Sequence, residues 1–269
     1  MPPLTGRVAL VTGASRRAGI GAAVARRLVA DGAAVLLHGW EPHDAEQPWG
    51  ADTAGLRTLA ASLASSGGRV ATAVADLTDP AAPRALVESA LDEFGRLDIV
   101  VANHARSVPW ASLEDLDAAE IDLSYAVNTR ATLLLVKEFA AARKAAAELP
   151  NAPGADVPGR IVLLTSGQID GPMPAEIPYA ASKAALAGIT PSLAAALAPH
   201  STVNCVNPGP TDTGWADADV TASVVGTMPF GRWGRPEDAA NVIAWLVGPD
   251  AGWVTGQVIS SDGGWSLRT

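Results

Sequence analysis

The sequence predicts a doubly wound α/β fold, in which one seven-stranded parallel sheet is flanked by helices within a single domain. Short apolar segments bounded by turn residues alternate along the whole chain with longer segments of helical spacing. The apolar segments are continuous, which is typical of parallel strands buried on both faces. The chain has 269 residues and contains neither an internal repeat nor a linker. We therefore expect residues 1–269 to form one domain.

Seven apolar segments are predicted to be strands. Each is rich in Val, Leu, Ile or Ala and is followed at once by Gly, Asp, Asn, Pro or Ser, residues that favour turns. In chain order the predicted strands cover residues 8–12, 34–38, 69–75, 98–102, 161–165, 202–207 and 258–260. Helical segments separate them, so we expect right-handed crossovers between parallel neighbours.

The segments between these strands are predicted to be helices or loops. The helices cover residues 21–31, 52–65, 80–94, 117–147, 179–198 and 236–246. Glycine follows the first of them at Gly32, and the last begins Pro236-Glu237-Asp238, which suits a helix N-terminus. Residues 41–51 and 148–159 are rich in Pro and Gly and are predicted to be loops.

Composition excludes several classes of protein. A formal net charge of −9 disfavours a nucleic-acid-binding face, and 48% hydrophobic residues support a packed core. The one cysteine, Cys205, cannot form an intramolecular disulfide, which fits a reducing compartment. Residues 1–6 lack the pattern of a secretory signal, and no run of 18 apolar residues indicates a membrane span. We expect a cytoplasmic protein that binds neither nucleic acid nor membrane and holds no metal.

A glycine-rich turn follows the first predicted strand. It reads Thr-Gly-Ala-Ser-Arg-Arg-Ala-Gly-Ile-Gly over residues 12–21 and leads directly into a helix. Glycines let such a turn approach a pyrophosphate closely, and the helix N-terminus supplies N–H donors and a positive dipole end. The sequence therefore predicts a dinucleotide site whose contacts are Gly13, Ser15, Arg16, Arg17, Gly19, Ile20 and Gly21.

The choice of dinucleotide depends on the end of the second strand. An acidic residue about 20 residues after the glycines would bind a ribose 2′-hydroxyl and favour NAD, but this position falls near Gly39. Arg16 and Arg17 are suited to a 2′-phosphate instead. We therefore prefer NADPH, with Trp40 at the adenosine end. In the alternative, the arginines are solvated, Glu41 takes the acidic role, and NADH is the cofactor.

A candidate proton-transfer pair lies at the start of a later helix. Tyr179 and Lys183 are spaced i and i+4, so they share one helix face. They are one of two tyrosines and one of three lysines in the chain. A tyrosine can work near neutral pH only if a cation stabilises its phenolate. Ser166 ends the fifth strand, at the edge where doubly wound sheets bind ligands.

These motifs together resemble the short-chain dehydrogenase/reductase family over nearly the whole chain. Further matching residues are Asp76, Leu77, Asn103, Asn128, Asn207-Pro208-Gly209, Thr255-Gly256-Gln257 and Asp262-Gly263-Gly264. The resemblance implies a Rossmann-type fold and an oxidoreductase that interconverts a ketone or 3-oxoacyl carbonyl and a secondary alcohol. It implies Tyr179 as general acid/base, Lys183 as the group that lowers its pKa and holds the nicotinamide ribose, Ser166 as hydrogen-bond donor to the substrate, and Asn128 as holder of a relay water.

The resemblance also implies further cofactor contacts. They are Asp76 at the adenine, Leu77 beside it, Asn103 behind the glycine-rich turn, and Pro208, Gly209, Thr211 and Thr213 near the carboxamide and pyrophosphate. Asp76 as a plain turn residue is the alternative.

Two departures from the family pattern stand out. Gly13 and Gly19 are separated by two more residues than usual, and His104 occupies the motif that follows the fourth strand. We favour His104 as a packed neutral imidazole, with a place in the substrate pocket as the alternative.

Loops after strands four, five and six are expected to build the substrate pocket from Trp110, Gln168, Met173 and Trp215, with packing of the loops as the alternative role. The chain is most similar to the 3-oxoacyl-thioester reductase branch. Its net charge opposes an acidic carrier protein unless Arg130, Lys137, Arg143 and Lys144 cluster, so we favour a free ketone or alcohol.

Other classes of function and the assembly state are also addressed by the sequence. Small residues on the helix after Tyr179 predict close helix pairing and a homotetramer, although alanine richness alone is the alternative explanation. A cofactor-binding regulator would have no reason to keep Asn128, Ser166, Tyr179 and Lys183 together. A lyase or epimerase on the same fold would use the tyrosine differently.

Overall fold

The computed structural model describes residues 1–47, 50–52, 55–148, 157–216 and 218–267. Within them, seven parallel strands form one sheet in the order β3-β2-β1-β4-β5-β6-β7. The strands are β1 (Val8–Val11), β2 (Ala34–Gly39), β3 (Val70–Val74), β4 (Ile99–Ala102), β5 (Gly159–Leu164), β6 (Ser201–Asn207) and β7 (Val258–Ser260). This doubly wound sheet confirms the predicted fold class.

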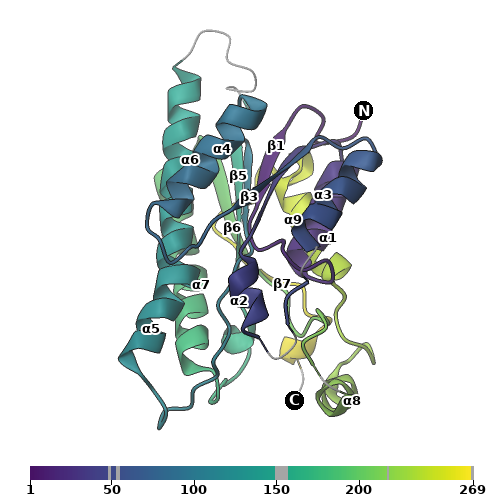
Figure 1. Ribbon diagram of the computed structural model, residues 1–269, viewed down its shortest axis with the longest axis vertical. Coiled ribbons are helices and arrows are strands. Elements are labelled where there is room, and N and C mark those ends of the chain that lie inside the picture. Colours follow the sequence, from purple (N-terminus) through teal and green to yellow (C-terminus); the bar gives the residue numbers. More distant parts are fainter. Residues whose placement is uncertain (48–49, 53–54, 149–156, 217, 268–269) are drawn as a thin grey trace.

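Helices cover both faces of the sheet (Figure 1). On one face lie α1 (Ile20–Ala30), α3 (Gly55–Ser65) and α9 (Pro236–Val247); on the other lie α4 (Ala82–Phe94), α6 (Ala131–Ala147) and α7 (Ile177–Leu197). Successive strand residues point to opposite faces, so Ala9 packs on the α1 side and Leu10 on the α4 side. Both faces are covered, which is why the central strands read as continuous apolar segments.

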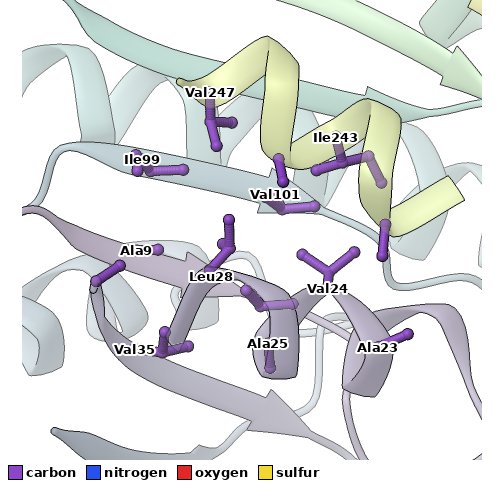
Figure 2. Packing of buried hydrophobic residues seen from close by; sticks show 14 of the residues in the cluster. Ala9, Ala23, Val24, Ala25, Leu28, Val35, Ile99, Val101, Ile243 and Val247 are labelled. Atoms are coloured by element: carbon purple, nitrogen blue, oxygen red, sulfur yellow. The ribbon is translucent and has the colours of Figure 1, made fainter. Parts of the chain in front are cut away.

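The layer that contains α1 and α9 shows how this core is packed (Figure 2). Val24 and Leu28 of α1 and Ile243 of α9 lie over the strands and are fully buried. Alanines such as Ala25 keep the two helices close to each other and to the sheet. Full burial of each large side chain stabilises the fold by about 1.5–3 kcal/mol.

Strands β1 and β4 are paired with each other, and the strand order reverses between them. In doubly wound sheets, ligands bind outside the carboxyl ends of the strands at this reversal. Short elements collect at that end of the molecule: α2 (Glu41–Ala45), α5 (Ala118–Ser124) and α8 (Ala218–Thr227) (Figure 1). Single 3₁₀ turns lie at Gly167–Ile169, Pro249–Ala251 and Trp265–Leu267.

Three elements differ from the sequence-based expectation. Part of the predicted loop 41–51 forms α2, because Pro42 occupies its first turn and Glu41 and Asp44 favour the positive end of its dipole. The predicted helix 117–147 is interrupted by a π-helical turn at Tyr125–Arg130. The loop after β6, which was expected to help build the substrate pocket, contains α8. All three lie at the edge of the sheet that carries the site.

Helix α7 is long and apolar enough to cross a membrane by length and composition alone. In the structure, however, it packs against β6 and β5 and buries Ser182, Lys183 and Thr190. These polar side chains are hydrogen-bonded within the protein, as buried polar groups require.

Candidate active site

The glycine-rich turn after β1 is held against the start of the loop after β4. Asn103 donates from Nδ2 to the carbonyl oxygens of Thr12 and Gly13, at 3.0 and 2.9 Å. Gly13 has a φ of +69°, and a Cβ there would lie 2.8 Å from the Cα of His104. A Cβ on Gly21 would lie 2.5 Å from the Gly13 carbonyl oxygen. Glycine is thus required at both positions for the turn to close.

This turn faces a cavity of about 330 Å³ at the carboxyl ends of β1 to β4. Five residues predicted to bind cofactor line it: Gly13, Ser15, Trp40, Asp76 and Leu77. Gly19, the N-cap of α1, has no side-chain cap bond within the described residues, which leaves helix N–H groups for a phosphate. The cavity and the uncapped helix end fit a dinucleotide. Asp76 also accepts a hydrogen bond from the Thr78 N–H at 2.8 Å, as a turn residue does, and its contact with adenine stays a prediction.

The sequence missed the contribution of α2 to this cavity. Pro42, His43 and Asp44 all line it, although residues 41–51 were predicted to be a loop. The carboxylate of Asp44 accepts a hydrogen bond from the Ser15 hydroxyl. An acid therefore does reach the glycine-rich turn, five residues after the end of β2, because the short helix folds back. Proline at the first turn of this segment was the signal in the sequence.

Arg16 and Arg17 are bound to protein groups. Arg17 forms a two-pronged ion pair with Asp52, with Nε–Oδ2 and Nη2–Oδ1 distances of 2.7 and 3.1 Å. Arg16 donates from Nη2 to the carbonyl oxygen of Thr213 at 2.7 Å. Among the residues described as lining the cavity, neither arginine is found. The predicted clamp on a 2′-phosphate thus requires Arg17 to exchange its partner.

Tyr179 and Ser166 come together at the carboxyl edge of β5. The Ser166 hydroxyl lies close enough to the phenol to influence its pKa. Burial raises the pKa of Tyr179 above its usual value, Ser166 works against that, and the nearby Glu176 carboxylate adds to it. The phenol is therefore held in its protonated form, which is the form that can donate a proton.

Lys183 is buried one turn after Tyr179 on α7. Its Nζ donates to the carbonyl oxygens of Leu164 and His104, at 3.0 and 3.3 Å. Burial lowers the pKa of Lys183 to about 8, so part of the population is neutral near physiological pH. The causes that shift the pKa of Tyr179 are burial, Ser166 and Glu176. Lowering of this pKa by Lys183 stays a prediction.

Asn128 lies in the π-helical turn and is fully buried. Its Oδ1 accepts from the Arg106 N–H at 2.7 Å, and its Nδ2 donates to the Arg106 carbonyl at 2.9 Å and to Ser182 Oγ at 2.8 Å. Ser182 in turn donates to the Tyr179 carbonyl. Asn128 therefore ties the loop after β4 to the start of α7, and its role in a water relay stays a prediction.

His104 is buried between the glycine-rich turn and the π-helical turn. Its Nε2 lies 3.1 Å from the Val127 carbonyl, to which it donates, and its Nδ1 accepts from the Thr12 hydroxyl at 2.7 Å. Burial lowers the pKa of His104 well below its usual value, and Lys183 adds to the effect. The imidazole is thus packed and neutral. It also lines the cavity described above, and its predicted alternative place in the substrate pocket stays a prediction.

The segment after β6 folds back over the glycine-rich turn. Gly209 has a φ of +61°, and a Cβ there would lie 2.5 Å from Cβ of Asp262. Thr211 Oγ1 donates to the Pro208 carbonyl oxygen at 3.1 Å, so its hydroxyl is used within the loop. Thr213 reaches the turn through its carbonyl, which accepts from Arg16.

Two of the predicted substrate residues meet. The rings of Trp110 and Trp215 lie edge to face with centroids 6.3 Å apart. Trp233, which the sequence did not single out, lies 5.7 Å from Trp215. Gln168 follows Ser166 in the 3₁₀ turn, and Met173 accepts from the Glu176 N–H through its carbonyl at 3.1 Å. In the described part of the chain, no group of three His, Cys, Asp or Glu residues is placed to hold a metal.

Several known proteins are similar to this chain over almost its whole length. Residues 13–266 match a family model described as enoyl-(acyl carrier protein) reductase. An uncharacterized oxidoreductase of Bacillus subtilis is 38% identical over 259 residues, 96% of each chain. A short-chain dehydrogenase/reductase from Serratia marcescens has a TM-score of 0.84 at 35% identity, covering 98% of this chain and 99% of that one.

A short-chain dehydrogenase from Burkholderia cenocepacia, solved in complex with NADP, has a TM-score of 0.82 at 34% identity, with coverage of 98% and 99%. The matches extend over the sheet, the glycine-rich turn and the Ser166–Tyr179–Lys183 constellation. The chain therefore belongs to the short-chain dehydrogenase/reductase family of oxidoreductases.

Proposed function

We propose that this chain is an NADP(H)-dependent enzyme that interconverts a free ketone and a secondary alcohol, with Tyr179 as general acid/base. The closeness of the Ser166 and Tyr179 hydroxyls at the sheet edge carries the proposal. In the proposed reaction one hydroxyl donates a proton and the other orients the carbonyl oxygen. Lys183 connects this pair to the dinucleotide cavity, because its Nζ donates to the carbonyl of His104, a residue that lines the cavity.

The reduction requires one hydride and one proton. A bound reduced nicotinamide supplies the hydride to the carbonyl carbon. Tyr179 donates its phenolic proton to the carbonyl oxygen, so that a C–H and an O–H bond form as the C=O π bond breaks. Ser166 donates a hydrogen bond to the same oxygen. Lys183, charged below its pKa of about 8, stabilises the phenolate that remains. Reprotonation through a water at Asn128 is part of the proposal.

NADP(H) is favoured over NAD(H) on two grounds. The Burkholderia cenocepacia neighbour was solved with NADP. In this chain, Arg16 and Arg17 lie on the glycine-rich turn, where guanidinium groups suit a 2′-phosphate. Asp44 and Asp52 oppose this preference, since both carboxylates lie at the same turn. The balance between these charges sets how strong the preference is.

A free substrate is favoured over a carrier-bound 3-oxoacyl thioester. The net charge of −9 opposes an acidic carrier. Of the basic residues considered for such a contact, Arg143 is buried against Asp98, Lys137 pairs with Glu138, and Arg130 donates to the Thr78 carbonyl. Two of the four basic residues are thus paired with carboxylates, which reduces the positive charge available to a carrier. We also propose that the protein is a cytoplasmic homotetramer.

Substitution of Tyr179 tests the chemistry directly. We expect Tyr179→Phe to lower kcat for ketone reduction with NADPH by roughly 10²–10⁴-fold, because the proton donor is lost. Tyr125→Phe is the matched control, since Tyr125 is the other tyrosine of the chain and is 38% exposed. In the wild type, kcat/KM for reduction should fall as the pH rises through about 8, where Lys183 loses its charge.

Other results of these measurements would exclude the proposed mechanism or favour a different function. Equal rates for Tyr179→Phe and the wild type would exclude the proposed mechanism. Binding of NADPH with no turnover of any ketone would favour the cofactor-binding regulator. Conversion of a substrate without net use of NADPH would favour a lyase or epimerase.

A further inference from the structure

Three tryptophans form a contiguous aromatic group beside the catalytic helix. Trp110 lies in the loop after β4, and Trp215 and Trp233 lie in the segment after β6. The planes of Trp110 and Trp215 meet at 84°, and those of Trp215 and Trp233 at 68°. Trp233 is 6% exposed and donates from Nε1 to the Thr221 carbonyl at 3.0 Å. Its ring is therefore held in place, and Trp215 packs against it. Trp110 is 54% exposed, which leaves an aromatic surface open at the outer end.

Main-chain contacts place this group across the site. Ala111, next to Trp110, accepts through its carbonyl from the N–H of Ile177 at 3.1 Å. Ile177 begins α7, two residues before Tyr179. On the other side, Thr213, two residues before Trp215, accepts from Arg16 of the glycine-rich turn. The segments that carry the paired rings therefore contact the catalytic helix on one side and the glycine-rich turn on the other.

Gln168, in the 3₁₀ turn that follows Ser166, presents an unused hydrogen-bond acceptor. Its Nε2 donates to Thr165 Oγ1 at 2.7 Å, and Thr165 Oγ1 donates its own hydrogen to the Lys183 carbonyl at 2.9 Å. This chain of donors fixes which end of the amide is which. The Oε1 atom is buried and has no hydrogen-bond partner among the described residues. A buried acceptor without a partner is costly, and here it lies two residues after Ser166.

From these two features we infer that the substrate is a planar aromatic ketone that carries a hydrogen-bond donor such as a hydroxyl group. The ring packs on Trp215 and Trp110, and the donor binds Gln168 Oε1. This inference rests on the proposed function and adds the class of its substrate. Aromatic side chains favour edge-to-face and offset contacts with another ring over contacts with a saturated ring of the same size.

A panel on one carbon skeleton tests both parts. We would compare 2-decalone, 2-tetralone and the four phenolic 2-tetralones with the hydroxyl at positions 5 to 8. The aromatic ring should raise kcat/KM on the order of tenfold over 2-decalone, and one hydroxyl position should add a similar factor. Equal kcat/KM for 2-decalone and 2-tetralone would overturn the aromatic part. The absence of a preferred phenol would overturn the role of Gln168.

Substitutions assign these preferences to residues. Trp215→Leu should reduce the ratio of 2-tetralone to 2-decalone to about one, because the ring surface is lost. Trp245→Leu is the matched control, since Trp245 lies on α9 and is 44% exposed. Gln168→Met keeps the size but not the acceptor, and it should abolish the ratio of the preferred phenol to 2-tetralone. Ratios that survive these substitutions would contradict the inference.

Calorimetric titration of the ketones into the protein without cofactor separates this inference from the proposed function. The preferred phenol should bind more tightly than 2-decalone, and Trp215→Leu should remove the difference. If the ketones bind with this preference but none is reduced, the proposed function fails and the binding site stands. If all are reduced and bound equally well, the function stands and the inference fails.

Discussion

At the scale of single residues, carboxylates close to the glycine-rich turn decide how its charge is presented. Asp44 accepts from Ser15, and Asp52 binds Arg17 through two hydrogen bonds. The Arg17 hydrogen bonds lower the pKa of Asp52 below its usual value, so this carboxylate stays charged at neutral pH. An anionic ligand must therefore compete with Asp52 for Arg17.

We expect Asp52→Asn to tighten NADP⁺ binding by about 2- to 5-fold, because exposed ion pairs of this kind are weak and the competing charge is gone. NAD⁺, which has no 2′-phosphate, should bind with unchanged affinity. Fluorescence titration gives both dissociation constants. Asp31→Asn is the matched control, since Asp31 pairs with Arg27 in a similarly exposed ion pair away from the cavity. A ratio of the two constants that does not change would contradict the proposed role of Arg17.

His104 also shows how one residue connects two parts of the site. Its ring joins Thr12 to Val127, and its own carbonyl accepts from Lys183. The sequence placed His104 at the end of β4 and left two roles open. Only the distances from both ring nitrogens to protein partners decide that it is a packed, neutral imidazole.

At the scale of elements, a buried carboxylate links three segments at the amino ends of the strands, opposite the site. Asp98 precedes β4 and is fully buried. Its oxygens accept from the Val8 N–H of β1 at 2.9 Å, from Arg96 at 2.7 Å, and from Arg143 of α6 at 3.0 Å. Burial lowers the pKa of nearby Arg7 to about 10, while Asp98 works against this. Asp98 thus holds β1, β4 and α6 in register.

We expect Asp98→Asn to lower the free energy of unfolding by about 3–5 kcal/mol, because the buried guanidinium groups lose their counter-charge. Urea denaturation followed by circular dichroism measures the loss. Glu88→Gln removes one partner of an exposed ion pair with Arg84 and should leave the urea midpoint unchanged. Equal midpoints for Asp98→Asn and the wild type would show that hydrogen bonds alone hold this corner.

At the scale of the whole molecule, the two edges of the sheet differ. β7 pairs with β6, and its Val258 is 39% exposed; beside it in the chain, Trp253 is 98% exposed. On α7, Ala184 is exposed, and a Cβ built on Gly188 would have no described heavy atom within 4 Å. Exposed apolar groups on an edge strand and small residues on a helix favour contacts with other copies of the chain. These surfaces support the proposed homotetramer.

Light scattering after size exclusion should give four times the chain mass of 27.4 kDa. Val258→Lys places a charge on the β7 edge and should reduce the mass to that of a smaller species. Val74→Lys is the matched control at the opposite edge, where Val74 of β3 is 66% exposed. A monomeric wild type would exclude the tetramer, and equal effects of the two lysines would exclude β7 as the contact.

By itself, the sequence determined the order of strands and helices, the glycine-rich turn and the Tyr179–Lys183 spacing. Each of these depends on signals within a few residues: apolar periodicity, glycine conformations and helix spacing. The same signals were too weak for α2 and α8, which are short, and for the π-helical turn, which is stabilised by His104 from another part of the chain.

The tertiary structure alone decided which partners the functional side chains have. It brought Asp52 to Arg17, Asp44 to Ser15 and Trp215 to Trp110, and it left one atom of Gln168 without a partner among the described residues. Trp110 and Trp215 come from different loops of the same sheet edge. Contacts of this kind depend on how separate elements pack, and no local pattern in a sequence encodes that distance.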